Sequence, residues 1–134
     1  MPNDSTHPSQ PGLTTSETIE TLLQRRSIRK YSDAPVTDAQ VDAILRAAFR
    51  APTSSNIQSY TVITVRDPET KQKLSVPAGN QNHIVDCPVF LAFCADLTRL
   101  EHVLNERGHT LEDNNLEIGL VSSIDASLVG MSSY

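Results

Sequence analysis

The feature that most constrains the fold is an apolar run at 88–95, with the sequence PVFLAFCA. A short run of this kind, without polar alternation, is typical of a β-strand that is covered on both faces. It is also far shorter than the roughly 20 apolar residues that a membrane-spanning helix needs. We therefore expect a buried strand with helices on either side of it, and no membrane partner.

A second strand is predicted at Tyr60–Val65, a segment rich in β-branched residues. Before it, Thr37 and Gln40 have the spacing of a helix capping box, and Pro52 disfavours helical geometry in the residue that precedes it. These signals predict a helix between Thr37 and Ala51. The residues expected on its buried face are Val41, Ile44, Leu45 and Ala48.

Three shorter helices are predicted from apolar spacing and capping residues. One begins near Ser16, one covers 69–74, and one runs from Thr98, its expected cap, to Gly108. Residues 77–82 are expected to form a loop. Because helices are mixed with only two strands, we expect an α+β fold with a small central sheet flanked by helices. The residues expected on the buried face of the first helix are Ile19, Leu22 and Leu23.

A long helix is predicted at 116–131. It has no glycine cap, no proline stop and no basic last turn before Tyr134. We therefore expect the fold to be truncated inside this long central helix; the alternative is a genuine carboxyl-terminal helix that frays in solvent. The apolar residues on one side of this helix are Leu116, Leu120, Val121, Ile124, Leu128 and Met131, and the small residues that leave room for close packing are Gly119, Ala126, Ser127 and Gly130.

The amino-terminal segment 1–15 is rich in Pro, Ser, Asn and Gln and has no periodic apolar pattern. We expect it to be a disordered tail, followed by a single domain at 16–134. It has neither the basic start nor the apolar stretch of a secretory signal, so a cytoplasmic protein is expected.

The charge balance argues against some partners. The formal net charge is -5 and the pI is about 5.2, so the field of the whole molecule does not attract nucleic acid. The two cysteines, Cys87 and Cys94, lie in an apolar segment and are expected to be small buried thiols. The four histidines are scattered without metal-ligand spacing, so no metal site is expected.

The densest functional signal is the segment Arg25–Lys30, with the sequence RRSIRK. Arginine forks hold phosphate oxygens through two hydrogen bonds each, and a serine hydroxyl adds another. Helical spacing would place Arg25, Arg26 and Arg29 within one turn, whereas a helix end would splay them. By itself, the cluster is better explained as a solvated basic helix end.

Two polar loops are further candidates. The segment 51–58 (APTSSNIQ) carries hydroxyl and amide groups that can hydrogen-bond the edge of a planar polar ligand, and 78–83 (AGNQNH) carries amides on a flexible backbone. By composition alone, each of these segments is an ordinary loop between regular elements.

The order and spacing of these segments is more informative than any one of them. The sequences RRSIRKY, APTSSNIQSY, AGNQNH and PVFLAFCADL follow one another in an arrangement that resembles the nitroreductase family of flavoproteins. The likeness is to the subgroup of oxygen-insensitive NADPH nitroreductases and NADPH–flavin oxidoreductases. It covers Thr18 to about Ser133, which is nearly all of the chain that is expected to be ordered.

The resemblance implies ten cofactor-binding positions, no catalytic side chain and no metal. The loop that reaches FMN, often from the partner subunit, would supply Pro52, Thr53, Asn56 and Gln58. The amide at the polar edge of the flavin would be Gln81 or its neighbour Asn80. Arg25 stands where many relatives have histidine. The contacts to the FMN phosphate and ring edge would fall on Arg25, Arg26, Ser27 and Arg29.

The resemblance also implies an activity. Members bind FMN non-covalently at the interface of an intertwined homodimer, and pass electrons from NAD(P)H to a small-molecule acceptor such as a nitroaromatic, a quinone or a flavin. They are roughly twice as long as this chain, so the enzyme would be present here as its amino-terminal half. The alternative that stays open is a truncated, catalytically inactive remnant of the flavodomain.

Overall fold

The computed structural model describes residues 15–111 and 116–134. The predicted tail therefore lies, apart from Thr15, outside the described residues. No helix in the described ranges is long and apolar enough to cross a membrane. In chain order the elements are α1 (Glu17–Leu23), α2 (Asp38–Ala48), a 3-10 turn (Ser54–Asn56), β1 (Tyr60–Val65), α3 (Pro68–Ser75), α4 (Asn82–Asp86), β2 (Phe90–Ala95), α5 (Thr98–Glu106) and α6 (Leu116–Ser132).

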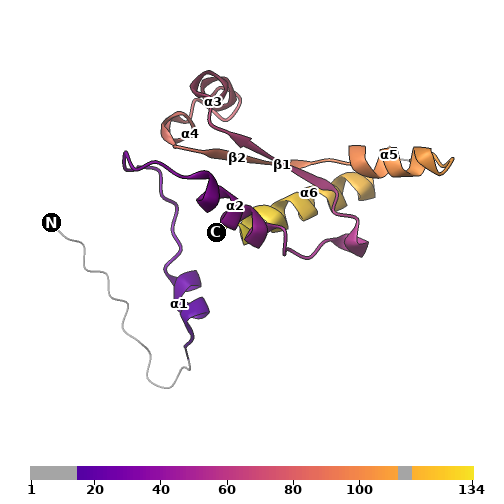
Figure 1. Cartoon of the computed structure of the whole chain (residues 1–134), viewed down its shortest axis with the longest axis horizontal. Coiled ribbons are helices and arrows are strands. Elements are labelled where there is room, and N and C mark those ends of the chain that lie inside the picture. The colour runs from indigo at the N-terminus through magenta and orange to yellow at the C-terminus, as the bar shows by residue number, and fades with distance from the viewer. Residues whose placement is uncertain (1–14, 112–115) are drawn as a thin grey trace.

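The two predicted strands pair with each other. β1 and β2 form an antiparallel two-stranded sheet in which Tyr60 lies opposite Ala95 and Val65 lies opposite Phe90. Their connection carries α3 and α4, which lie together at one end of the sheet, and α5 extends from the other end (Figure 1). This arrangement confirms the predicted α+β class with a small sheet.

The core lies where α6 crosses the sheet and meets α2. Ala48 of α2 and Val129 of α6 are both fully buried. A Cβ atom at Gly130 would lie 3.4 Å from the ring of Phe93 on β2, so this glycine allows α6 to approach the strand closely. The predicted close packing through Ala126 and Gly130 is confirmed, whereas Gly119 has no neighbour that a Cβ would meet within 4 Å.

The buried side of α6 is not its large apolar side. Leu116 is 87% exposed, and Leu120, Ile124, Leu128 and Met131 are also exposed. A two-stranded sheet and one neighbouring helix cover only a narrow strip of α6, and the small residues on that strip permit the closest approach. The residues that α6 buries are Ser122, Asp125, Ala126 and Val129.

Two burial predictions were wrong. The residues Ile19, Leu22 and Leu23 of α1 are exposed, because α1 lies apart from the sheet and nothing described covers its apolar side (Figure 1). β2 is half-buried along most of its length and is not covered on both faces. The prediction of two buried thiols holds for Cys87, while Cys94 is half-buried.

Helix boundaries agree with the sequence except at two places. The capping box of Thr37 and Gln40 is present at the start of α2. Thr98 is the first residue of α5 and not its cap, since Leu97 occupies that position without a side-chain hydrogen bond. The loop predicted at 77–82 ends in the short helix α4, which the sequence analysis missed because five residues are too few to show apolar periodicity.

Candidate functional site

The basic segment is irregular. α1 ends at Leu23, and the backbone from Arg25 to Lys30 has no regular secondary structure. Of the two arrangements that the spacing allowed, the single helical turn is therefore wrong, and the arginines are splayed along an irregular stretch. Such a stretch lets successive side chains and amides surround a ligand instead of lining one side of a helix.

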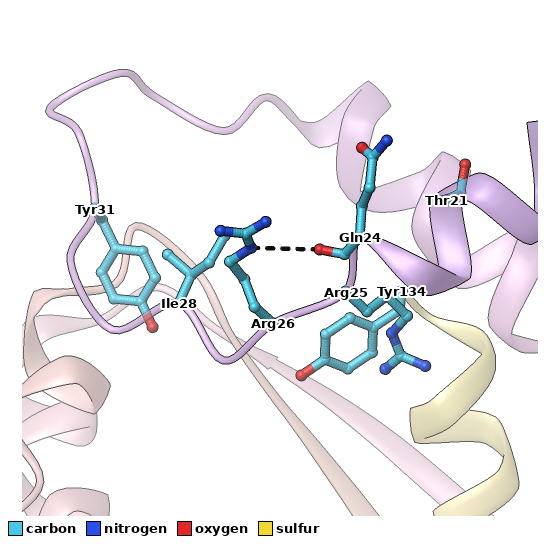
Figure 2. A pocket seen from close by; sticks show the side chains of 7 residues that line it. All are labelled: Thr21, Gln24, Arg25, Arg26, Ile28, Tyr31 and Tyr134. Carbon is cyan, nitrogen blue, oxygen red and sulfur yellow. Dashed lines mark hydrogen bonds between the residues drawn. The ribbon is translucent and has the colours of Figure 1, made fainter. Parts of the chain in front are cut away.

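Arg25 is anchored at the end of α6. Its guanidinium carbon lies 4.0 Å from the centre of the Tyr134 ring, and its Nη1 lies 3.0 Å from the sulfur of Met131. Figure 2 shows the side chains of Arg25 and Tyr134 against each other at the end of the α6 ribbon. The cation–π contact fixes the plane of the guanidinium without neutralising its charge. The Nε of Arg25 is buried and has no hydrogen-bond partner within the described part of the chain.

A hollow opens beside this anchored arginine. A volume of about 210 Å³ is lined by Arg25, Arg26, Ser27 and Tyr134. A neighbouring hollow of about 530 Å³ shares Arg25, Arg26 and Tyr134 and extends to Tyr31 (Figure 2). The Nε of Arg26 lies 3.4 Å from the carbonyl oxygen of Gln24. Two guanidinium groups and a serine hydroxyl around one hollow are a donor set suited to a phosphate group.

The second candidate loop has an unusual backbone. Ser55, Asn56 and Gln58 have φ angles of +50°, +55° and +55°. Such left-handed conformations are uncommon in residues other than glycine and persist where the surroundings hold them. They leave Asn56 exposed and Gln58 half-buried, beside the start of β1.

Two charged side chains hold this loop from outside. Asp125 of α6 accepts hydrogen bonds from the amides of Ser54 (3.0 Å) and Ser59 (3.3 Å). Arg99 of α5 donates from Nη2 to the carbonyl oxygens of Gln58 (2.7 Å) and Ile57 (3.3 Å). Neither residue was predicted from the sequence. A lone carboxylate among small residues in the middle of α6 is the signal that could have pointed to Asp125.

The third candidate loop makes a tight turn. Gly79 and Asn80 have φ angles of +83° and +57°, and the amide of Asn80 donates to the carbonyl oxygen of Ser75 (2.8 Å). Gln81 then stands at the start of α4, where its side chain makes no capping hydrogen bond. The side-chain amide of Gln81 therefore does not cap α4.

The three candidate segments do not form a single cavity. The hollow beside Arg25 includes Arg26 and Ser27 but neither Arg29 nor any residue of 52–58, 80 or 81. Sequence analysis also missed Tyr134 and Met131, which contact Arg25, because sequence alone does not show that the end of α6 returns to the start of the chain. No group of three or more His, Cys, Asp or Glu side chains in the described ranges is placed to bind a metal ion.

Asp96, directly after β2, links the end of that strand to the start of β1 and to α5. Its amide donates to the carbonyl oxygen of Ser59 (3.0 Å), and its carboxylate accepts from the hydroxyl of Thr61 and from the amide of Thr98 (2.9 Å). The pKa of Asp96 is lowered to about 2, mainly by the hydrogen bond from Thr61 and next by those from Thr98.

This lowered pKa predicts an acid-sensitive element. Because the pKa of Asp96 is lower in the folded chain than in the unfolded one, its contribution to stability is present above about pH 4 and is lost as the pH falls to about 2. In Asp96→Asn the urea midpoint should therefore fall less steeply over this range than in the wild type. The measurement is urea unfolding at several pH values, followed by circular dichroism. Equal pH dependence of the two proteins would contradict the prediction.

The chain is similar to a known family of proteins. The model of the nitroreductase family matches residues 22–113. An FMN reductase (NADPH) of Bacillus subtilis is 43% identical over 115 residues, which are 84% of this chain and 46% of that protein. The chain thus spans about half the length of the curated relatives it matches.

Solved structures agree with this match. The NfrA1 nitroreductase of B. subtilis superposes with a TM-score of 0.82 and 42% identity, over 87% of this chain and 48% of that one. The NADPH:FMN oxidoreductase of Vibrio harveyi, solved with NAD+, superposes with a TM-score of 0.79 and 32% identity, over 87% and 49% of the two chains. On the family match, which covers most of its length, the chain belongs to the nitroreductase family.

Proposed function

We propose that this chain is part of an FMN-dependent oxidoreductase that passes electrons from NAD(P)H to nitroaromatic, quinone or flavin acceptors. The relatives named above support the cofactor and the electron donor, since one is called an FMN reductase (NADPH) and another an NADPH:FMN oxidoreductase. The observation that carries the proposal is the hollow beside Arg25, which two arginines and a serine line together.

The residues present fit the phosphate end of FMN. Arg25, Arg26 and Ser27 present charged and hydroxyl donors around one hollow, and Tyr134 already holds the guanidinium of Arg25 in place. A preoriented donor loses little conformational entropy when a phosphate binds. Arg29 is proposed as a further contact to the cofactor, which it would make from outside this hollow.

The flavin ring would be held by amides and hydroxyls. Pro52, Thr53, Asn56 and Gln58 are proposed to reach it from the second copy of a homodimer, with Gln81 or Asn80 at its polar edge. Two observations support the dimer: the hollow beside Arg25 contains no residue of this loop, and α6 exposes a row of large apolar side chains. A cytoplasmic location, expected from the amino-terminal segment, is part of this proposal.

FMN, when bound, supplies hydride and electron transfer, which no protein side chain performs. The side chains of this chain hold and orient the reactive ring. Arginine and amide donors beside the polar edge of the ring would stabilise the negative charge that develops there on reduction. The proposal therefore assigns no proton-transfer step to a side chain of this chain.

The test is flavin binding by the 134-residue chain. FMN and riboflavin are titrated separately, and the quenching of flavin fluorescence is followed. Riboflavin lacks the phosphate, so FMN should bind at least about 100-fold more tightly if the arginine hollow holds the phosphate. Electron transfer is then assayed as acceptor-dependent oxidation of NADPH and of NADH. Equal affinity for FMN and riboflavin would exclude the phosphate site, and absence of FMN binding would favour the inactive remnant.

A further inference from the structure

Among the buried charged residues of the described chain, Asp125 is the least exposed, with 1% of its surface exposed. Its Oδ1 accepts from the amide of Ser54 (3.0 Å), and its Oδ2 accepts from the amide (3.3 Å) and hydroxyl (2.9 Å) of Ser59. No lysine, arginine or histidine in the described ranges forms an ion pair with it. Burying a carboxylate without a cation is costly unless hydrogen bonds satisfy its oxygens.

The three donors lie at the two ends of one loop. Between Ser54 and Ser59 the backbone passes through left-handed conformations at Ser55, Asn56 and Gln58. A carboxylate that grips both ends from one point on α6 fixes the separation of these ends and so selects this uncommon conformation. A purely apolar contact would fill the same space but would leave two backbone amides without partners.

A cation holds the middle of the same loop. Arg99 of α5 donates to the carbonyl oxygens of Ile57 and Gln58, while Asp125 accepts from the amides at the loop's ends. Carbonyl groups therefore point toward α5 and amide hydrogens toward α6. The loop is therefore hydrogen-bonded to both helices, which hold the backbone that carries Asn56 and Gln58.

From this geometry we infer that Asp125 is a positioning residue that presets the 53–59 loop for cofactor binding. The inference rests on the proposed function, since it concerns the loop assigned to the flavin ring. Asp125 does not itself touch the cofactor in this view; it acts through Asn56 and Gln58. With the loop preset, the ordering of these side chains is completed during folding and does not weaken binding.

The test compares Asp125→Asn with the wild type. The variant keeps the shape of the side chain but turns an NH2 group toward one of the backbone donors, so the loop should loosen. We expect about ten-fold weaker FMN binding, measured by fluorescence quenching. Without flavin, we expect faster hydrogen exchange at the amides of Ser54 and Ser59, measured by NMR, and unchanged exchange in β1 and β2.

Ser122→Ala is the matched control. Ser122 is equally buried on α6, but its hydroxyl donates to the carbonyl oxygen of Ile118 within the same helix. This variant should keep wild-type FMN affinity and wild-type exchange at Ser54 and Ser59. Ser59→Ala, which removes one of the three donors, should give a smaller effect than Asp125→Asn.

The outcomes separate the two proposals. Wild-type FMN affinity in Asp125→Asn overturns the positioning role and leaves the proposed function intact. Faster exchange throughout the sheet also overturns it, because the residue would then be structural only. Absence of FMN binding in the wild type overturns the proposed function and, with it, the role of Asp125 in cofactor binding.

Discussion

Replacing Arg25 and Arg26 together with glutamine is expected to weaken FMN binding by at least about 100-fold. Hydrogen bonds to charged groups contribute about 1.5–3 kcal/mol each, so losing one at each arginine removes about 3–6 kcal/mol. Glutamine keeps part of the apolar stem that packs beside Tyr134, which limits damage to the fold. Affinity is measured by fluorescence titration at several salt concentrations, and the wild type should lose more affinity with salt than the variant.

A matched variant controls for charge. The double variant Arg46→Gln, Arg107→Gln also removes two positive charges, but from the exposed side of α2 and from the end of α5. Neither residue lines the hollow beside Arg25. It should bind FMN as the wild type does. Riboflavin adds a second control, since its affinity should be nearly the same in all three proteins. A loss of FMN affinity that is equal in both double variants would show that net charge, and not the Arg25 hollow, governs binding.

The sequence predicted the regular elements well where local chemistry decides them. The capping box at Thr37 and the β-branched run at Tyr60–Val65 each act within a few residues of themselves. Burial was predicted less well. Apolar spacing identifies a helix and its apolar side, but which side is covered depends on what packs there. In α6 the covered strip belongs to small residues and one carboxylate, and the leucines are exposed.

The site shows the same division. The basic segment and the two polar loops were evident from residue types, and the family resemblance assigned them to one cofactor. The residues that hold them were not evident. Asp125 and Ser54 are separated by 71 positions, and Arg25 and Met131 by 106. Such contacts exist only after α6 has packed on the sheet, so no local pattern in the sequence carries them.

Replacing Val129 with aspartate is expected to lower the free energy of unfolding of the chain strongly. Val129 is a fully buried residue of α6, one helical turn after Asp125. The three donors described above already serve Asp125, so a new carboxylate would be buried near a like charge without a partner. Such a change costs roughly 3–5 kcal/mol, a large part of the roughly 5–15 kcal/mol that stabilises a domain.

Urea unfolding followed by circular dichroism measures this loss, and two further variants locate its cause. Ser127→Asp places the same carboxylate two residues earlier, on the exposed side of α6, and should shift the urea midpoint only slightly. Val129→Ala removes apolar volume without adding charge and should fall between the other two. If Val129→Asp were no less stable than Ser127→Asp, α6 would not be packed against the sheet and α2 through this face, because the cost arises only if water is excluded from position 129.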